Sequence, residues 1–164
     1  MNETTPPPLI DGPASFVPAL RWGFSTAVAQ RARRIVCVDA DFAAWPLDEV
    51  ELLGSLTAWL RLPMRRLVML ARDYGGVPRR QPRYTAWRRD WSHAVDCRQV
   101  PEDMSAELPS LLVSDGAVCV RLFDPLGGRG VAHDDARIAR VAMAEIDAVL
   151  QRSEAAFAAD NLGL

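Results

Sequence analysis

The sequence Ile35-Val36-Cys37-Val38 is a continuous, mostly β-branched run, typical of a strand covered on both faces. A second apolar run follows at 67–71, and between the two runs apolar residues recur at helical intervals over 48–62. Asp48 and Glu51 have the spacing of a capping box at the start of that helix. The strand–helix–strand unit predicts two parallel strands joined by a right-handed crossover.

Further elements are predicted on both sides of this unit. A helix is expected over 21–32, and a second over 82–93 with Pro82 at its first position. A third strand follows at 95–100. The runs 110–114 and 117–123 flank Asp115-Gly116, a strong signal for a two-residue hairpin.

The last third of the chain predicts a loop and one long helix. Gly127, Gly128 and Gly130 form a glycine-rich loop that we expect to be mobile. After it, a helix over 134–158 would carry an apolar stripe along one face, formed by Ile138, Val141, Ile146, Val149, Leu150 and Phe157.

These elements predict a single α/β (or α+β) domain over residues 21–164. Its mixed sheet would have about five strands, with a βαβ start, a closing hairpin and a long C-terminal helix. Residues 1–20 contain five prolines and no periodicity, so we expect an N-terminal arm there.

Length and composition indicate a globular protein of the cytoplasm. The 164 residues suit one domain, and no apolar run approaches the roughly 18 residues of a membrane helix. The first residues lack a basic stretch followed by an apolar one, as a secretory signal would have. The three cysteines form no CxxC pair, so we expect buried, reduced thiols and no zinc.

The chain contains no lysine, because all 19 basic residues are arginine. This excludes a Schiff base, a Walker A lysine and a Ser-Lys dyad. His93 and His133 are the only histidines, and neither stands beside a recognisable nucleophile. We expect each to act as a polar cap or a buried hydrogen-bonding group, and we expect no cofactor.

The arginines are concentrated in the middle of the chain. Residues 61–98 hold ten Arg and three Asp, a local net charge of +7 in a protein whose formal net charge is −2. Aromatic residues lie among these arginines, as in grooves that bind single-stranded nucleic acid. The candidate anion-binding residues are Arg72, Arg79, Arg80, Arg83, Arg88, Arg89, Trp87 and His93.

A structural interpretation of the same block stays open. The arginines would pair with the acidic C-terminal third, and Trp87 and Trp91, four residues apart, would lie on the core face of one helix. The sequence pI of about 5.7 favours this interpretation, because nucleic-acid-binding domains usually exceed a pI of about 9.

Asp39 and Asp41 suggest an alternative, catalytic function. An Asp-x-Asp after a buried strand is similar to the nucleophile motif of magnesium-dependent phosphatases, and Asp73 would follow the next strand. Those enzymes also need a lysine, which this chain lacks. The structural interpretation is that the two carboxylates cap the turn leading into Trp45-Pro46.

A phosphate site at the glycine loop is less favoured. Backbone amides at a helix N-terminus can cradle phosphate. Here, however, Asp134 and Asp135 would occupy the end of the following helix and repel an anion.

From residue 33 to the end, the chain resembles a bacterial family of small uncharacterised proteins. The segments that carry this resemblance are 41–48, 82–93, 151–157 and 161–164. That family has no assigned activity, so the resemblance implies a group and no function.

The order of elements is also similar to one half of a phospholipase-D-like domain. Those enzymes use His-x-Lys-x4-Asp, in which the histidine attacks phosphorus and the lysine steadies the phosphate. His93 and His133 are not followed by that lysine. The resemblance therefore implies an inactive half-domain, and the pairing of halves in such enzymes implies a homodimer.

The sequence as a whole favours a non-catalytic cytoplasmic binding or interaction domain. It would recognise an anionic ligand or nucleic acid, or form a homodimer, through the Arg/Trp-rich helix at 79–93, and it would not enter a membrane. The alternative is a divergent metal-dependent phosphoester hydrolase that uses Asp39 and Asp41. A third possibility is a structural adaptor that docks through its Pro-rich arm or through Gly163-Leu164.

Overall fold

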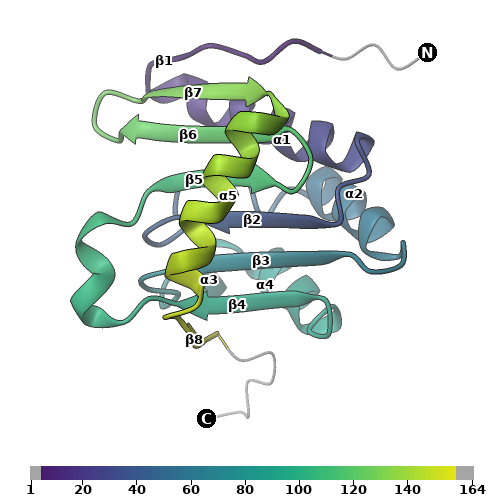
Figure 1. Ribbon diagram of the computed structural model, residues 1–164. Helices are drawn as coiled ribbons and strands as arrows, with labels where there is room; N and C mark the ends of the chain where they lie inside the picture. The colour runs from purple at the N-terminus through teal and green to yellow at the C-terminus, as the bar shows by residue number, and fades with distance from the viewer. Residues whose placement is uncertain (1–4, 158–164) are drawn as a thin grey trace.

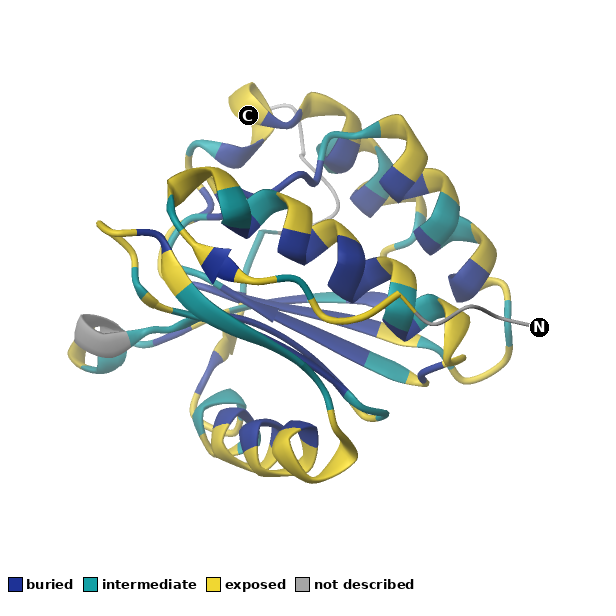
Figure 2. Ribbon diagram, turned by 90° about the horizontal axis from the view of Figure 1, so that it is seen from above, coloured by how far each residue is buried: buried dark blue, intermediate teal, exposed yellow. Residues whose placement is uncertain are grey.

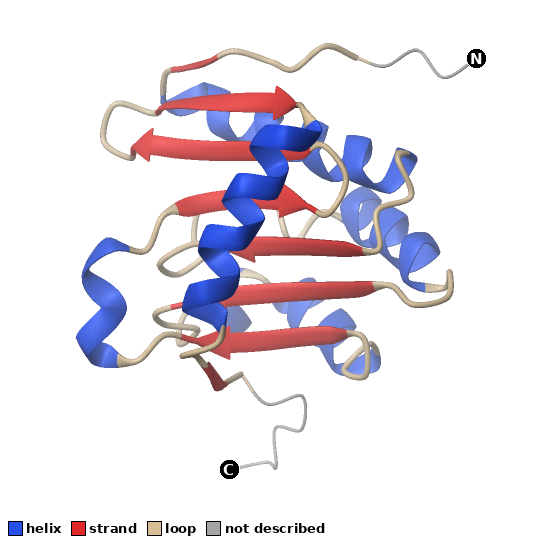
Figure 3. Ribbon diagram, viewed as in Figure 1, coloured by secondary structure: helices blue, strands red, loops and turns tan. Residues whose placement is uncertain are grey.

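The computed structural model describes residues 5–157, and it shows one mixed sheet with helices on both faces (Figures 1 and 3). The order of strands across the sheet is β1-β7-β6-β5-β2-β3-β4-β8. Their bounds are β1 Ile10–Asp11, β2 Arg34–Val38, β3 Arg66–Ala71, β4 Val95–Gln99, β5 Ser110–Ser114, β6 Val118–Asp124, β7 Arg129–Asp134 and β8 Glu154–Ala155.

Helices cover the two faces of the sheet unequally. One face carries α1 (Phe16–Ala29), α2 (Val50–Leu60), α3 (Val77–Arg80) and α4 (Pro82–Asp90). The opposite face carries α5 (Ala136–Leu150) alone, which crosses the strands obliquely (Figures 1 and 2). Two short 3-10 helices, Pro13–Ser15 and Glu102–Glu107, lie in the connections.

The predicted strand–helix–strand unit is confirmed. β2 and β3 are parallel, with Ile35 opposite Leu67, and β4 continues the parallel set with Val95 opposite Leu67. β5 and β6 form the predicted antiparallel hairpin, and β5 pairs antiparallel with β2. The α/β class is therefore as expected, although the sheet has eight strands instead of about five.

The three additional strands include β7, which begins within the segment predicted to be a mobile glycine-rich loop and ends where the long helix was predicted to begin. The chain turns at Gly127 and Gly128 and then returns alongside β6. Gly128 has a φ of +67°, which favours glycine. At Gly130 a Cβ would collide with the carbonyl of Arg121, so glycine allows this close pairing. The glycine-rich segment is therefore a hairpin turn and the start of a strand.

Helix α5 is shorter than predicted, and only part of the predicted stripe packs on the core, namely Ile146, Val149 and Leu150. Its buried residues are Ala139, Ala142, Met143 and Ile146, while Ile138 and Val141 are 37% and 60% exposed. The small alanines bring the helix close to the sheet, so the larger apolar side chains beside them remain at the surface.

Two helix starts also differ from the prediction. α1 begins at Phe16, five residues before its predicted start. The helix tolerates Pro18 because this residue falls in the first turn, where a backbone N–H has no partner within the helix. Residues of the expected N-terminal arm pack on the domain: the Thr5 carbonyl accepts from Trp22 Nε1 at 2.9 Å. α2 begins at Val50, and Asp48 does not cap it.

The core has two parts, one on each face of the sheet. The larger part lies under α1, α2 and α4 and includes Phe24, Trp59 and Tyr84. The smaller part lies under α5 and includes Val36, Leu70 and Ile146. Cys37, Cys97 and Cys119 are free and buried, as predicted. Within residues 5–157, no helix has the length and apolar character needed to cross a membrane.

Candidate anion-binding site

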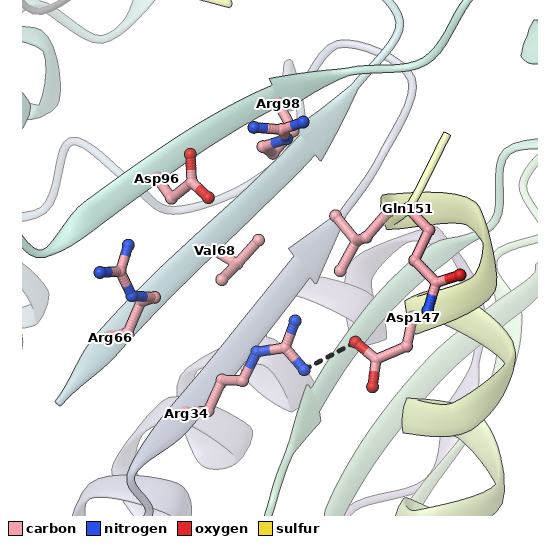
Figure 4. A pocket seen from close by; sticks show the side chains of 8 residues that line it. Arg34, Arg66, Val68, Asp96, Arg98, Asp147 and Gln151 are labelled. Carbon is pink, nitrogen blue, oxygen red and sulfur yellow. Dashed lines mark hydrogen bonds and ion pairs between the residues drawn. The ribbon is translucent and has the colours of Figure 1, made fainter. Parts of the chain in front are cut away.

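A pocket of about 450 Å³ lies on the α5 face of the sheet, between that helix and strands β2, β3 and β4 (Figure 4). Each of these three parallel strands contributes one arginine: Arg34, Arg66 and Arg98. The pocket is also lined by Val68, Asp96, Asp147, Leu150 and Gln151. We call it the sheet pocket.

The register of the strands brings these side chains together. Arg34 is opposite Arg66 across β2 and β3, and Asp96 is opposite Val68 across β3 and β4. Because side chains alternate between the faces of a strand, Asp96 and Arg98 both point toward α5, away from the larger core. The apolar side chain of Val68, which is buried, lies between the charged groups.

Arg98 is held in a fixed orientation. Its Nε donates to Ser153 Oγ at 2.9 Å and its Nη2 to the Ser153 carbonyl at 2.7 Å. Ser153 is itself buried, and its hydroxyl donates to the Leu150 carbonyl at 2.6 Å. A guanidinium anchored in this way loses little conformational freedom when a ligand binds.

The other charges in the pocket differ in their partners. Arg34 Nη1 donates to Asp147 Oδ1 at 2.7 Å, so these two charges neutralise each other. The side chains of Arg66 and Asp96 form no hydrogen bond or ion pair with any residue in the described part of the chain. The pocket thus offers Arg66, the fixed Arg98 and one carboxylate, a net charge of +1.

Sequence reasoning missed all three arginines of this pocket. Arg34 and Arg66 each stand at the start of an apolar strand, so the sequence suggests flanking residues. Arg98 lies inside a strand, where the sequence does not show which face it occupies. The one available signal is that parallel pairing of two strands with the same start aligns Arg34 with Arg66.

The predicted Arg/Trp cluster is dispersed around α3 and α4. Arg79, Arg80, Arg83 and Arg89 are exposed, and so is Arg72 beyond the end of β3. Arg80 Nη2 donates to the Asp41 carbonyl at 3.2 Å, and Arg83 lies 4.0 Å from the carboxylate of Asp48. These side chains provide a basic outer surface, but the structure does not gather all of them in one pocket.

Arg88 and Trp87 face inward instead. Arg88 is only 6% exposed, and its Nε donates to Cys97 Sγ at 2.9 Å. Trp87 packs against the larger core and donates from Nε1 to Thr57 Oγ1 at 2.8 Å. Trp91 also packs against this core, which confirms the predicted core face of the helix.

The histidines lie at the surface. His93 is exposed, and its ring centroid is 5.5 Å from that of Trp91. His133 is half-buried on β7, opposite Cys119. Of the two roles expected for His93, the exposure of the residue excludes the buried hydrogen-bonding group, and the polar cap stays a prediction.

Asp39 and Asp41 stabilise a turn, as in the structural interpretation. Asp39 Oδ2 accepts from the backbone N–H groups of Asp41 and Phe42, at 3.2 and 2.8 Å, and its Oδ1 accepts from Ser110 Oγ at 2.5 Å. Asp41 Oδ1 accepts from the Ala43 N–H at 3.0 Å. Asp73 likewise accepts from the Gly75 N–H. Across the described residues, no three His, Cys, Asp or Glu side chains form a group able to hold a metal.

Asp135 caps α5, which partly confirms the expectation for the two neighbouring aspartates. Its side chain accepts from the N–H groups of Arg137 and Ile138. Asp134 instead ends β7 and accepts from Gln30 Nε2 at 2.8 Å.

Two solved structures share this fold at low sequence identity. One is TrmBL2, an archaeal chromatin protein described as having a novel mode of DNA binding, with a TM-score of 0.59 and 14% identity. The match covers 90% of this chain and 54% of TrmBL2, so the chain spans about half the length of that protein. The other is Nuc from Salmonella typhimurium, with a TM-score of 0.55 and 9% identity over 84% of this chain and 90% of Nuc.

No protein-family model and no curated protein matches the chain. The resemblance to a bacterial family of small proteins therefore stays a prediction. Since Nuc is a phospholipase D family member, the expected likeness in fold to a phospholipase-D-like domain is confirmed.

Proposed function

We propose that this domain binds an anionic ligand in the sheet pocket and does not transform it. The observation that carries the proposal is the convergence of Arg34, Arg66 and Arg98, from three adjacent parallel strands, on one pocket. Guanidinium groups bind phosphate and carboxylate through paired N–H donors, and these bonds are stronger than those between neutral groups. The residues lining the pocket include no histidine, cysteine or serine that could act as a nucleophile.

Asp96 narrows the class of ligand. Its carboxylate accepts hydrogen bonds but donates none, so it repels a bare anion and favours one with a donor group beside the charge. A phosphate or carboxylate that carries a neighbouring hydroxyl or amino group satisfies Arg66, Arg98 and Asp96 together. Nucleic acid is the finer form of this proposal, since TrmBL2 is described as binding DNA and phosphate groups are the anions that a nucleic acid presents.

We also propose that this domain works in the cytoplasm. Cys37, Cys97 and Cys119 are free thiols in the interior, and free thiols persist in a reducing compartment such as the cytoplasm.

A binding measurement with matched variants tests the proposal. Isothermal titration calorimetry would follow the wild-type chain with inorganic phosphate, a sugar phosphate and a short single-stranded DNA. Arg98→Gln and Arg66→Gln should each weaken binding about tenfold, the value of one charge-assisted hydrogen bond. Arg140→Gln is the control, because Arg140 is an exposed arginine of α5 outside the pocket. Equal affinity in all four proteins would overturn the proposal.

Helix α5 supports a second proposal, that two copies of this chain associate. Ile138 and Val141 flank a groove of about 440 Å³ between α5 and strands β6 and β7. Arg137 and Glu145 line the same groove, four residues on either side of Val141. If a second α5 packs antiparallel across a two-fold axis at Val141, each Arg137 faces the partner's Glu145. This dimer uses α5, whereas the sequence predicted the Arg/Trp-rich helix.

Disulfide trapping locates the interface. Val141→Cys would lie at the two-fold axis, and it should form a cross-linked dimer on mild oxidation. Ala86→Cys, exposed on α4 at the opposite face of the sheet, is the control and should stay uncross-linked. Light scattering should show Val141→Glu as a monomer. A monomeric wild-type chain, or a dimer that Val141→Glu leaves intact, contradicts this interface.

A further inference from the structure

A second, smaller pocket lies at the edge of β4, next to the short stretch where β8 pairs with it. Its volume is about 260 Å³, and its lining includes Arg66, Arg88, Ser92, Asp96 and Cys97. β8 pairs with Arg98 and Gln99, so within the described part of the chain no strand lies beside the edge of β4 at Val95 and Asp96. We call this the edge pocket. It shares Arg66 and Asp96 with the sheet pocket, but Arg88 belongs to it alone.

Arg88 is a buried cation with incomplete partners. The residue is 6% exposed. Its Nε donates to Cys97 Sγ at 2.9 Å and its Nη2 to the Phe157 carbonyl at 3.1 Å. Its Nη1 is buried and has no hydrogen-bond partner among residues 5–157. None of the described groups that Arg88 contacts is a carboxylate.

A guanidinium remains charged at any pH at which the protein folds, so Arg88 needs a counter-charge. Cys97 does not supply one, because burial raises the pKa of its thiol and keeps the sulfur neutral at neutral pH. Asp96 also lines the pocket, but it forms no ion pair with Arg88. The buried positive charge is therefore unneutralised by the described residues around it.

We propose that the edge pocket binds a small anion, a carboxylate or phosphate group, that pairs with Nη1 of Arg88. Exposed Arg66 supplies a second cation at the same pocket, and the hydroxyl of Ser92 supplies a donor. Asp96 limits the site to an anion small enough to remain on the side of Arg88. The two pockets share Arg66 and Asp96, so Arg88, which lines the edge pocket alone, is the residue that separates this site from the proposed function.

The test follows the arginine side chain directly. In protein labelled with 15N-arginine, the Nε–H resonance of Arg88 is identified by its loss in Arg88→Gln. Sodium chloride, sodium acetate and inorganic phosphate are then titrated at matched ionic strength. We expect a saturable shift of this resonance with acetate or with phosphate, and the anion that produces it identifies the class of ligand.

Two variants separate this site from the sheet pocket. Arg98→Gln should leave the Arg88 response unchanged while it weakens binding in the sheet pocket. Arg88→Gln should reduce the saturable rise in Tm that the anion gives the wild-type chain, with Arg140→Gln, which lies outside both pockets, as the folded control that keeps the full rise. If Arg88→Gln fails to fold, the Arg88 Nε–H resonance is assigned instead by its correlation with the backbone of Arg88, and the wild-type titration decides. The same small shift with every salt would reflect ionic screening and overturn the proposal.

Discussion

The carboxylate of Asp48 caps helix α4, because its Oδ1 accepts from the backbone N–H of Arg83 at 2.7 Å and from that of Tyr84 at 3.1 Å. Asp48 and Arg83 are 35 residues apart in the sequence. The cap therefore also fixes the connection before α2 against the N-terminus of α4. The capping box read from Asp48 and Glu51 is therefore wrong, since the carboxylate serves a different helix.

Asp48→Ala should lower the free energy of unfolding by about 1–2 kcal/mol, the usual cost of removing a helix cap. Urea denaturation followed by circular dichroism measures this change. Asp48→Asn keeps an acceptor oxygen and should recover most of the loss. If both variants were as stable as wild type, the cap would contribute nothing to stability.

Gly23 sets the distance between α1 and the sheet. A Cβ at this position would lie 2.6 Å from Leu112 Cδ2 and 3.0 Å from Val120 Cγ2, and both of those side chains are fully buried. Gly23→Ala should therefore destabilise the fold by about 1–3 kcal/mol through overpacking, measured by urea denaturation.

Gly54 in α2 is the matched control for that change. No atom lies within 4 Å of a Cβ added there, and the residue is exposed. Gly54→Ala should raise stability by about 0.5–1 kcal/mol, because alanine favours the helix. A similar gain at Gly23 would show that α1 moves to accommodate the methyl group.

The substitution Asp39→Ala distinguishes a structural role of this carboxylate from a metal-binding one. It accepts three hydrogen bonds, from two backbone N–H groups and from Ser110, so Asp39→Ala should cost about 1–3 kcal/mol of stability. Magnesium or manganese should leave the Tm of the wild-type chain unchanged. A metal-dependent rise in Tm that disappears in Asp39→Ala would instead support the hydrolase alternative.

Stability should fall as the pH rises into the alkaline range. Burial raises the pKa of the Cys37 thiol and of the Tyr84 and Tyr74 hydroxyls well above their ordinary values. The folded chain keeps these protons while the unfolded chain releases them, from about pH 8.5 for cysteine and about pH 10 for tyrosine. The stabilisation is complete below those values and is lost above them.

Urea midpoints measured from pH 7 upward check this expectation. Cys37→Ala removes one of the groups, so its decline should be shallower than that of wild type, while burial of Cys97 and Cys119, which also raises the pKa of their thiols, keeps its start at the same pH. A wild-type stability that is constant through the alkaline range would show that these protons do not contribute.

The sequence predicted the elements whose signals are local. The apolar runs of β2 and β3 and the Asp115-Gly116 hairpin each carry their own periodicity or turn chemistry, and the structure contains all of them. β7 was missed because its glycines are typical of a loop, and only pairing with β6 makes them a strand. The stripe on α5 was right for Ile146, Val149 and Leu150. It was wrong for Ile138 and Val141, because the large apolar residues outweighed Ala139 and Ala142, which the helix buries.

The sheet pocket depends on relationships that no single segment contains. Arg34, Arg66 and Arg98 meet only because three strands align in one register and α5 leaves their charged ends uncovered. The local charge of residues 61–98 pointed instead to α4, where Arg88 is buried and Arg83 lies beside Asp48.

The two-residue strand β8 couples the last described residues to the sheet pocket. The same segment that lies along β4 carries Ser153, which fixes Arg98, and the Ala156 N–H donates to the Cys97 carbonyl at 2.9 Å. Local opening of this segment would release the guanidinium from its fixed orientation. A ligand held by Arg98 therefore disfavours that opening, and the amide of Ala156 becomes a reporter whose hydrogen exchange slows when the pocket is filled.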